Sequence, residues 1–124
     1  MKPRLLLTCA FAVAPLVLAD PGNRTATTQV APLLIQAIDA SSGQAFGVLT
    51  GDIADAISRR FGAASPIFID VSTERRLRQT GCSRLRVTFW QEGVLLPGAH
   101  APRKQTIEFG INYCRDGQPP RAPT

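Results

Sequence analysis

The chain has 124 residues, a length typical of a single domain, and its 14 basic against 9 acidic residues give a net charge of +5. Three cysteines and one histidine supply too few ligands for a zinc site. The sequence also lacks a glycine-rich phosphate loop and a Gly-x-Ser-x-Gly nucleophile elbow. It therefore predicts no metal site and no cofactor.

Residues 1–19 have the features of a cleavable signal peptide. Lys2 and Arg4 precede an apolar stretch over residues 5–18, and residues 17–19 satisfy the small-residue preference before a cleavage site. The apolar stretch is short for a transmembrane helix. We expect a mature chain without a membrane span, located in the periplasm or secreted. Cleavage leaves twelve basic and nine acidic residues, a net charge of +3 that does not by itself require a nucleic-acid partner.

The mature chain divides into a leader, one domain and a tail. Residues 20–29 are rich in Pro, Gly, Thr and Asn, which is typical of an extended leader. Residues 30–115 hold the apolar periodicity of a single α+β domain. Residues 116–124 contain three prolines and no apolar pattern, so we expect this tail to be disordered.

The domain pattern predicts two short helices followed by strands. Residues 32–40 and 52–61 show helical periodicity, and the second has acidic residues in its first turn and arginines in its last. Residues 66–72, 82–91 and 105–114 alternate as strands do, and residues 44–50 are compatible with a further short strand. We expect an α+β fold in which two helices pack on a three-stranded or four-stranded antiparallel sheet.

Two cysteines select the register of the C-terminal hairpin. If Cys82 and Cys114 face each other, partner numbers sum to 196, so that Leu85 faces Ile111 and Val87 faces Phe109. All odd-numbered positions then share one apolar face. Cys9 lies in the predicted signal peptide, so the exported chain keeps two cysteines, and an even number favours a disulfide. We expect the Cys82–Cys114 disulfide to stabilise a small domain. The predicted core is Ile53, Ile57, Phe61, Ile67, Ile69, Val71, Leu85, Val87, Phe89, Ile107, Phe109 and Ile111.

The polar face of the hairpin is the candidate interaction surface. Trp90 shares it with Arg84 and Arg86, and tryptophan and arginine are enriched at protein interfaces. The alternative is that the protein's own chain covers Trp90. The basic run of Arg75, Arg76 and Arg78 is either a solvated strand edge or a docking patch for an acidic partner or for DNA phosphates.

His100, the one histidine, lies in the hairpin connection at 93–104. Together with nearby Glu92 and Arg103 it could serve a ribonuclease-like reaction, but a solvated loop residue is the interpretation that the flanking small residues favour. The sequence brings no further acid or base beside it. We therefore expect no catalytic residues and a non-enzymatic protein.

Two segments of the hairpin carry a likeness to known proteins: Arg-Val-Thr-Phe-Trp-Gln-Glu-Gly at 86–93 and Phe-Gly-Ile-Asn-Tyr-Cys at 109–114. They resemble segments of small exported proteins encoded in conjugative-transfer gene clusters of Gram-negative bacteria. The likeness covers residues 48–118 and assigns a chemical role to no residue. It implies a periplasmic accessory of a conjugation or type IV secretion apparatus with a protein partner. A small basic secreted hydrolase or nuclease, or an inhibitor or immunity-type protein, are the alternatives.

The signal-peptide interpretation gives the first testable prediction. Intact-mass measurement of the exported protein should show a chain that begins at Asp20, because cleavage after Ala19 follows the small-residue rule. A mass that retains Met1, or a lipid on Cys9, would contradict the prediction.

Overall fold

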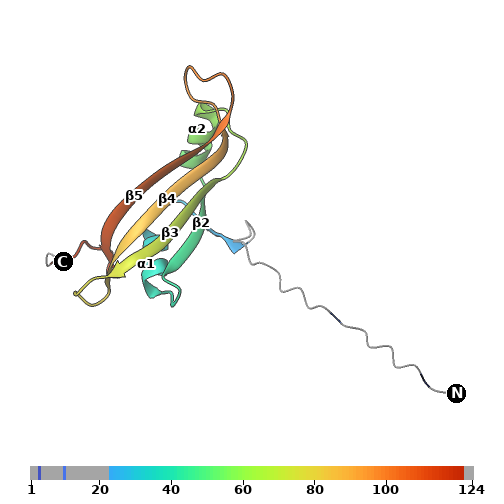
Figure 1. The fold of residues 1–124 in the computed structure, drawn as a ribbon. Coiled ribbons are helices and arrows are strands. Elements are labelled where there is room, and N and C mark those ends of the chain that lie inside the picture. Colours follow the sequence, from blue (N-terminus) through green and yellow to red (C-terminus); the bar gives the residue numbers. More distant parts are fainter. Residues whose placement is uncertain (1–2, 4–9, 11–22, 122–124) are drawn as a thin grey trace.

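The structure is a computed structural model that describes Pro3, Ala10 and residues 23–121. The predicted signal peptide, apart from those two residues, and the start of the leader therefore lie outside the described residues. The chain order is β1 (Thr25–Thr27), α1 (Ala31–Asp39), β2 (Gln44–Leu49), α2 (Asp52–Arg60), β3 (Ile67–Arg76), β4 (Cys82–Val94) and β5 (Arg103–Cys114) (Figure 1).

The five strands form one sheet in the order β1-β2-β3-β4-β5. The α+β class and the two helices are confirmed. The predicted strand number and the purely antiparallel pairing are wrong, because β1 adds a parallel partner to β2. β1 lies within the predicted leader and has only three polar or small residues. Its pairing depends on the crossover through α1 and not on any local alternation of its own.

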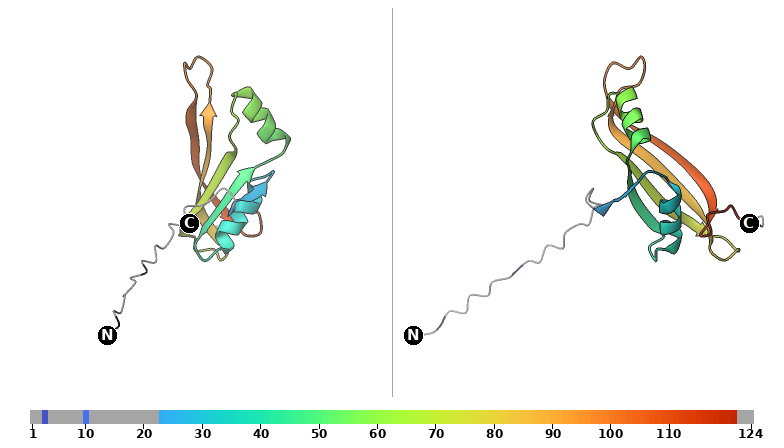
Figure 2. Two further views of the ribbon diagram at one scale, coloured as in Figure 1. Left: turned by 90° about the vertical axis from the view of Figure 1, so that its right-hand side faces the viewer. Right: turned by 180° about the vertical axis from the view of Figure 1, so that it is seen from behind.

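Both helices lie on one face of the sheet (Figure 2). The buried core joins Leu33, Leu34 and Ala37 of α1 to β2, β3 and β4. The sheet contributes Ala45, Ile69, Val71, Leu85 and Val87. The last four of these were predicted core residues, whereas the helix that packs on them is α1 and not the more strongly patterned α2.

Four predicted core residues are exposed. The exposed fractions are 66% for Ile53, 36% for Ile57, 67% for Ile107 and 41% for Phe109. The reason is that α2 stands beside the far half of the β4–β5 hairpin (Figure 2), where polar contacts tether it. The buried side chain of Gln91 donates hydrogen bonds to Ser58 Oγ at 3.0 Å and to the Ser65 carbonyl at 2.8 Å.

The hairpin register is confirmed from Cys82↔Cys114 to Gln91↔Gln105, and a disulfide joins the two cysteines. Both strands are longer than predicted, since pairing resumes at Val94↔Arg103 after an irregularity. Beyond Trp90, β4 pairs only with β5, because its register with β3 begins at Phe68↔Trp90. Among the residues that the structure describes, the far end of the hairpin therefore has no third strand beside it.

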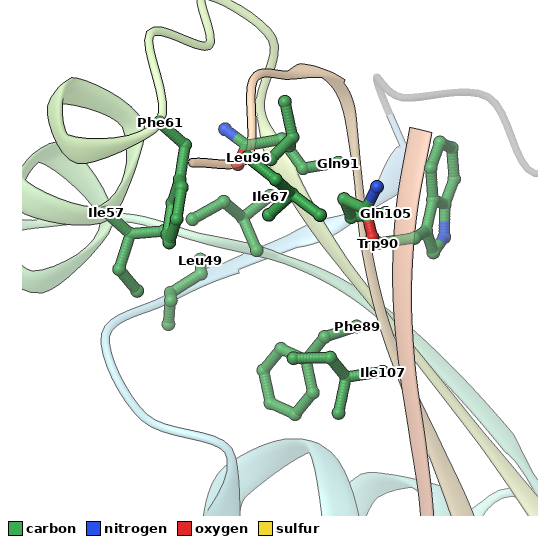
Figure 3. Close-up of a pocket in the computed structure, with 11 residues that line it drawn as sticks. Leu49, Ile57, Phe61, Ile67, Phe89, Trp90, Gln91, Leu96, Gln105 and Ile107 are labelled. Carbon is green, nitrogen blue, oxygen red and sulfur yellow. The ribbon is translucent and has the colours of Figure 1, made fainter. Parts of the chain in front are cut away.

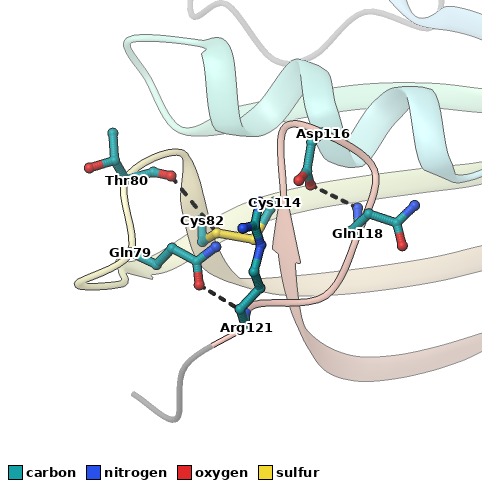
Figure 4. The surroundings of a disulfide bond; sticks show 7 residues. All are labelled: Gln79, Thr80, Cys82, Cys114, Asp116, Gln118 and Arg121. Carbon is teal, nitrogen blue, oxygen red and sulfur yellow. Dashed lines mark hydrogen bonds between the residues drawn. A yellow bond between two sulfur atoms is a disulfide. The ribbon is translucent and has the colours of Figure 1, made fainter.

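The described part of the tail, residues 116–121, folds against the base of the hairpin (Figure 4). The Gln118 amide donates to Asp116 Oδ1 at 3.0 Å, and the Arg121 amide donates to Gln79 Oε1 at 2.8 Å. The structure thus places residues 116–121, for which the sequence predicted disorder, through one hydrogen bond to the turn before β4 and one within the tail. Residues 122–124 lie outside the described residues.

Gly47 of β2 provides a test of how closely α1 packs on the sheet. A Cβ at Gly47 would overlap the side chain of Leu33 and lie 3.1 Å from the Thr25 carbonyl oxygen. We expect Gly47→Ala to lower the free energy of unfolding by about 1–3 kcal/mol, because a well-packed core has little room for an added methyl group. Urea unfolding followed by circular dichroism measures the change.

The matched control is Gly110→Ala on β5, where the added Cβ meets only the far end of the Arg84 side chain. That guanidinium can move, so the free energy of unfolding should stay within about 0.5 kcal/mol of wild type. An equal loss for both variants would contradict the packing described for α1.

Candidate functional site

The face of the sheet opposite the helices, here called the open face, carries the predicted interaction residues. Trp90 contacts Asp70 and Phe68 there, and Arg86 contacts Glu74 and Glu108. The even-numbered residues of β4 thus lie together on the polar side, as the alternation predicts. The structure brings Trp90, Arg84 and Arg86 onto one strand and one face.

The protein's own chain covers much of Trp90. Its ring packs against Phe68 with centroids 4.4 Å apart, and the Lys104 ammonium lies 4.5 Å from the ring centroid. The indole N–H donates to Asp70 Oδ2 at 2.8 Å. Of the two alternatives, the geometry favours internal cover, and the interface role of Trp90 stays a prediction.

Arg24, which the sequence did not single out, completes this cluster. Its guanidinium donates to Asp70 Oδ1 at 2.7 Å, and its side chain is only 5% exposed. The guanidinium carbon lies 4.5 Å from the ring centroid of Phe68, 5.6 Å from that of Trp90 and 5.7 Å from that of Phe46. We call Phe46, Phe68, Trp90 and Asp70 the aromatic cage. A single arginine in a polar leader carries no pattern from which this contact could be inferred.

Arg84 and Arg86 are engaged in contacts across the open face. Arg86 donates to Glu74 Oε1 at 2.9 Å and to Glu108 Oε1 at 2.6 Å. Hydrogen bonding to Glu74, with the charges of Glu108 and Glu74, raises the pKa of Arg86 above its ordinary value. Arg84 donates to Asn112 Oδ1 at 3.2 Å. Both arginines therefore have partners within the chain, and such exposed pairs contribute little to stability.

The basic run lies apart from Trp90. Arg75 and Arg76 end β3, which is an interior strand and not the edge that the sequence suggested, and Arg78 lies in the turn that follows. Arg75 pairs in register with Arg84, six residues along β4 from Trp90, which corresponds to about 20 Å of strand. All three arginines are exposed, and the described residues show no ion pair for them. The predicted surface therefore consists of two separate parts.

A hollow between α2 and the hairpin, here called the α2 groove, has a mostly apolar lining. It has a volume of about 260 Å³, and Figure 3 shows Ile57 of α2 and Phe61, which follows α2, on the side opposite Phe89 and Ile107 of the hairpin. Its lining is Leu49, Ile57, Phe61, Ile67, Phe89, Trp90, Gln91, Val94, Leu96, Gln105 and Ile107. Sequence reasoning assigned most of these apolar residues to the closed core and so did not identify the groove.

The structure gives no separate support for a catalytic or metal site. His100 is exposed on the hairpin loop, where it lines a shallow hollow with Arg103. Within the described residues, no group of three or more His, Cys, Asp or Glu side chains is placed to hold a metal ion. Among those same residues, no helix is both long and apolar enough to cross a membrane.

Comparison with known proteins gives no match: no protein-family model, no curated protein and no solved structure is similar to this chain.

The cover over Trp90 leads to a stability prediction. Trp90→Ala should lower the free energy of unfolding by about 2 kcal/mol or more, because it removes the ring contact with Phe68 and the donor to Asp70. Trp90→Phe keeps one six-membered aromatic ring and loses the donor together with the smaller ring of the indole, so its loss should be smaller, about 1 kcal/mol. His100→Ala, on the exposed loop, should change the value by less than about 0.5 kcal/mol. Urea unfolding of the three variants measures these values, and a Trp90→Ala variant as stable as wild type would indicate an open interface residue.

Proposed function

We propose that this protein is an exported, non-enzymatic binding protein that captures a partner protein in the α2 groove and along the edge of β5. The observation that carries the proposal is the apolar lining of that groove, continued by exposed Ile107 and Phe109 on β5. Large exposed apolar side chains next to an apolar hollow are typical of interaction sites.

The strand geometry supports an extended partner segment. β5 is an edge strand of twelve residues with no neighbour on its outer side in the described sheet. Such an edge presents backbone donors and acceptors to an added strand. Ile107 and Phe109 project from the same strand toward the helix side, so an added strand would meet both an apolar row and the groove.

The size of the groove also favours a peptide side chain over a small molecule. A volume of about 260 Å³ is below the usual range of ligand sites, which is roughly 300–1,000 Å³. Apolar side chains of a strand, spaced two residues apart, could occupy the groove without burying a polar group. The partner segment that fits best is therefore an extended one with alternating apolar residues.

The setting of this binding activity follows from the resemblance and the predicted signal peptide. The signal peptide supports export, and the resemblance supports a periplasmic accessory role in a conjugation or type IV secretion apparatus. The Cys82–Cys114 disulfide is compatible with an oxidising compartment.

A fluorescent seven-residue peptide with alternating isoleucine and threonine serves as the probe, measured by anisotropy. Ile107→Glu should weaken its binding at least tenfold, because a carboxylate on β5 would be buried against an apolar side chain. The matched control is Ile53→Glu, which changes an isoleucine of almost equal exposure, 66% against 67%, outside the groove. The control should bind as wild type does.

Equal losses for both variants would overturn the proposal, since they would indicate non-specific apolar contact. A second probe has proline, which has no backbone N–H to donate, at alternate positions of the peptide. The proposal would also be overturned if this peptide bound as tightly as the isoleucine–threonine peptide. A nuclease or hydrolase activity that His100→Ala abolishes would replace the non-enzymatic function by the enzyme alternative.

A further inference from the structure

The burial of Arg24 is unusual for its place in the chain. Arg24 directly precedes β1, an edge strand of three residues, yet its side chain is 5% exposed. Burying a guanidinium is costly unless it is paired and hydrogen-bonded. The aromatic cage must therefore supply interactions that offset this cost.

The aromatic cage has the composition of a cation-binding site. The rings of Phe46, Phe68 and Trp90 surround the guanidinium, and aromatic faces attract cations at such distances. Asp70 supplies the opposite charge through Oδ1, while the indole N–H of Trp90 holds Oδ2. The Gly47 carbonyl accepts a further hydrogen bond from the guanidinium at 3.1 Å.

The chemistry of the cage selects guanidinium over other cations. The guanidinium of Arg24 lies over the Phe68 ring, while its Nη1 amino group donates to the Asp70 carboxylate and to the Gly47 carbonyl. Arginine combines a stacking face with in-plane donors, whereas an ammonium is a strongly hydrated point charge.

The aromatic cage and Arg24 belong to parts of the fold that differ in how many strands pair with them. The cage residues come from β2, β3 and β4, and the latter two are interior strands of the sheet. Arg24 belongs to the arm at residues 23–27, which pairs with β2 alone and exposes the side chains of Thr25 and Ala26. Short edge elements with few buried contacts open at low free-energy cost.

We propose that the aromatic cage is a guanidinium-binding site, that Arg24 occupies it within the same chain, and that an arginine side chain of a partner peptide takes its place when the arm is released. This site is on the open face and does not depend on the α2 groove. Arg24 then acts as a tethered competitor whose effective concentration sets the affinity for external arginine.

Arg24→Ala should open the site to N-acetyl-arginine methylamide. Trp90 is the one tryptophan of the chain, so its fluorescence reports occupancy directly. We expect a dissociation constant in the millimolar range or tighter, about what one buried side chain provides. Wild type should bind at least tenfold more weakly. Arg24→Ala/Asp70→Asn, which lacks the counter-charge, should not bind.

The citrulline analogue is the matched ligand control, because it has nearly the shape of arginine without the charge. Circular dichroism confirms that each variant is folded, and Arg24→Gln, which keeps a polar side chain, replaces Arg24→Ala if that variant does not fold. The proposal is overturned if citrulline binds as well as arginine, if the folded variant binds no arginine, or if wild type binds as tightly as the variant.

Discussion

The register of the β4–β5 hairpin is the constraint on which the other features depend. The disulfide at its base holds Cys82 opposite Cys114, and the pairing continues unshifted to Gln91↔Gln105. Because side chains alternate with a period of two, a shift of one strand by one residue would exchange its apolar and polar sides. The same β4 also pairs with β3, which places Trp90 beside Phe68 and within reach of Asp70. Core, groove and aromatic cage therefore share one register.

The sheet has more apolar surface on its helix face than its helices cover. α1 closes the half that contains Val71, Leu85 and Val87. At the other half, α2 stands off and leaves Ile107 exposed on the edge strand β5, and Phe109, which lies opposite Val87 on the same edge strand, is exposed as well. Such an edge is a liability for a soluble protein unless it is covered or used. Stability alone does not account for large apolar residues there, whereas the partner segment that we propose to add to β5 would account for them.

Sequence patterns predicted what is local and missed what joins distant segments. The hairpin could be predicted because alternation and the cysteine pair agree within one stretch of chain. The helix α2 was predicted from its periodicity, but the predicted burial of Ile53 and Ile57 is wrong, since an amphipathic pattern does not identify the surface that it meets. β1 has three residues without alternation, and its pairing needs the crossover through α1. Arg24 reaches Asp70 across 46 positions, so no local pattern indicates the aromatic cage.

The two proposed binding regions meet at one short segment of β4. Phe89 and Gln91 line the α2 groove, while Trp90 between them also forms part of the aromatic cage (Figure 3). Gln91 is held from the α2 side by Ser58 and Ser65, and Trp90 is held from the open face by Asp70. This segment is thus fixed from both faces of the sheet. Trp90 is the residue of this segment that both regions share, since it lines the groove and forms one wall of the cage.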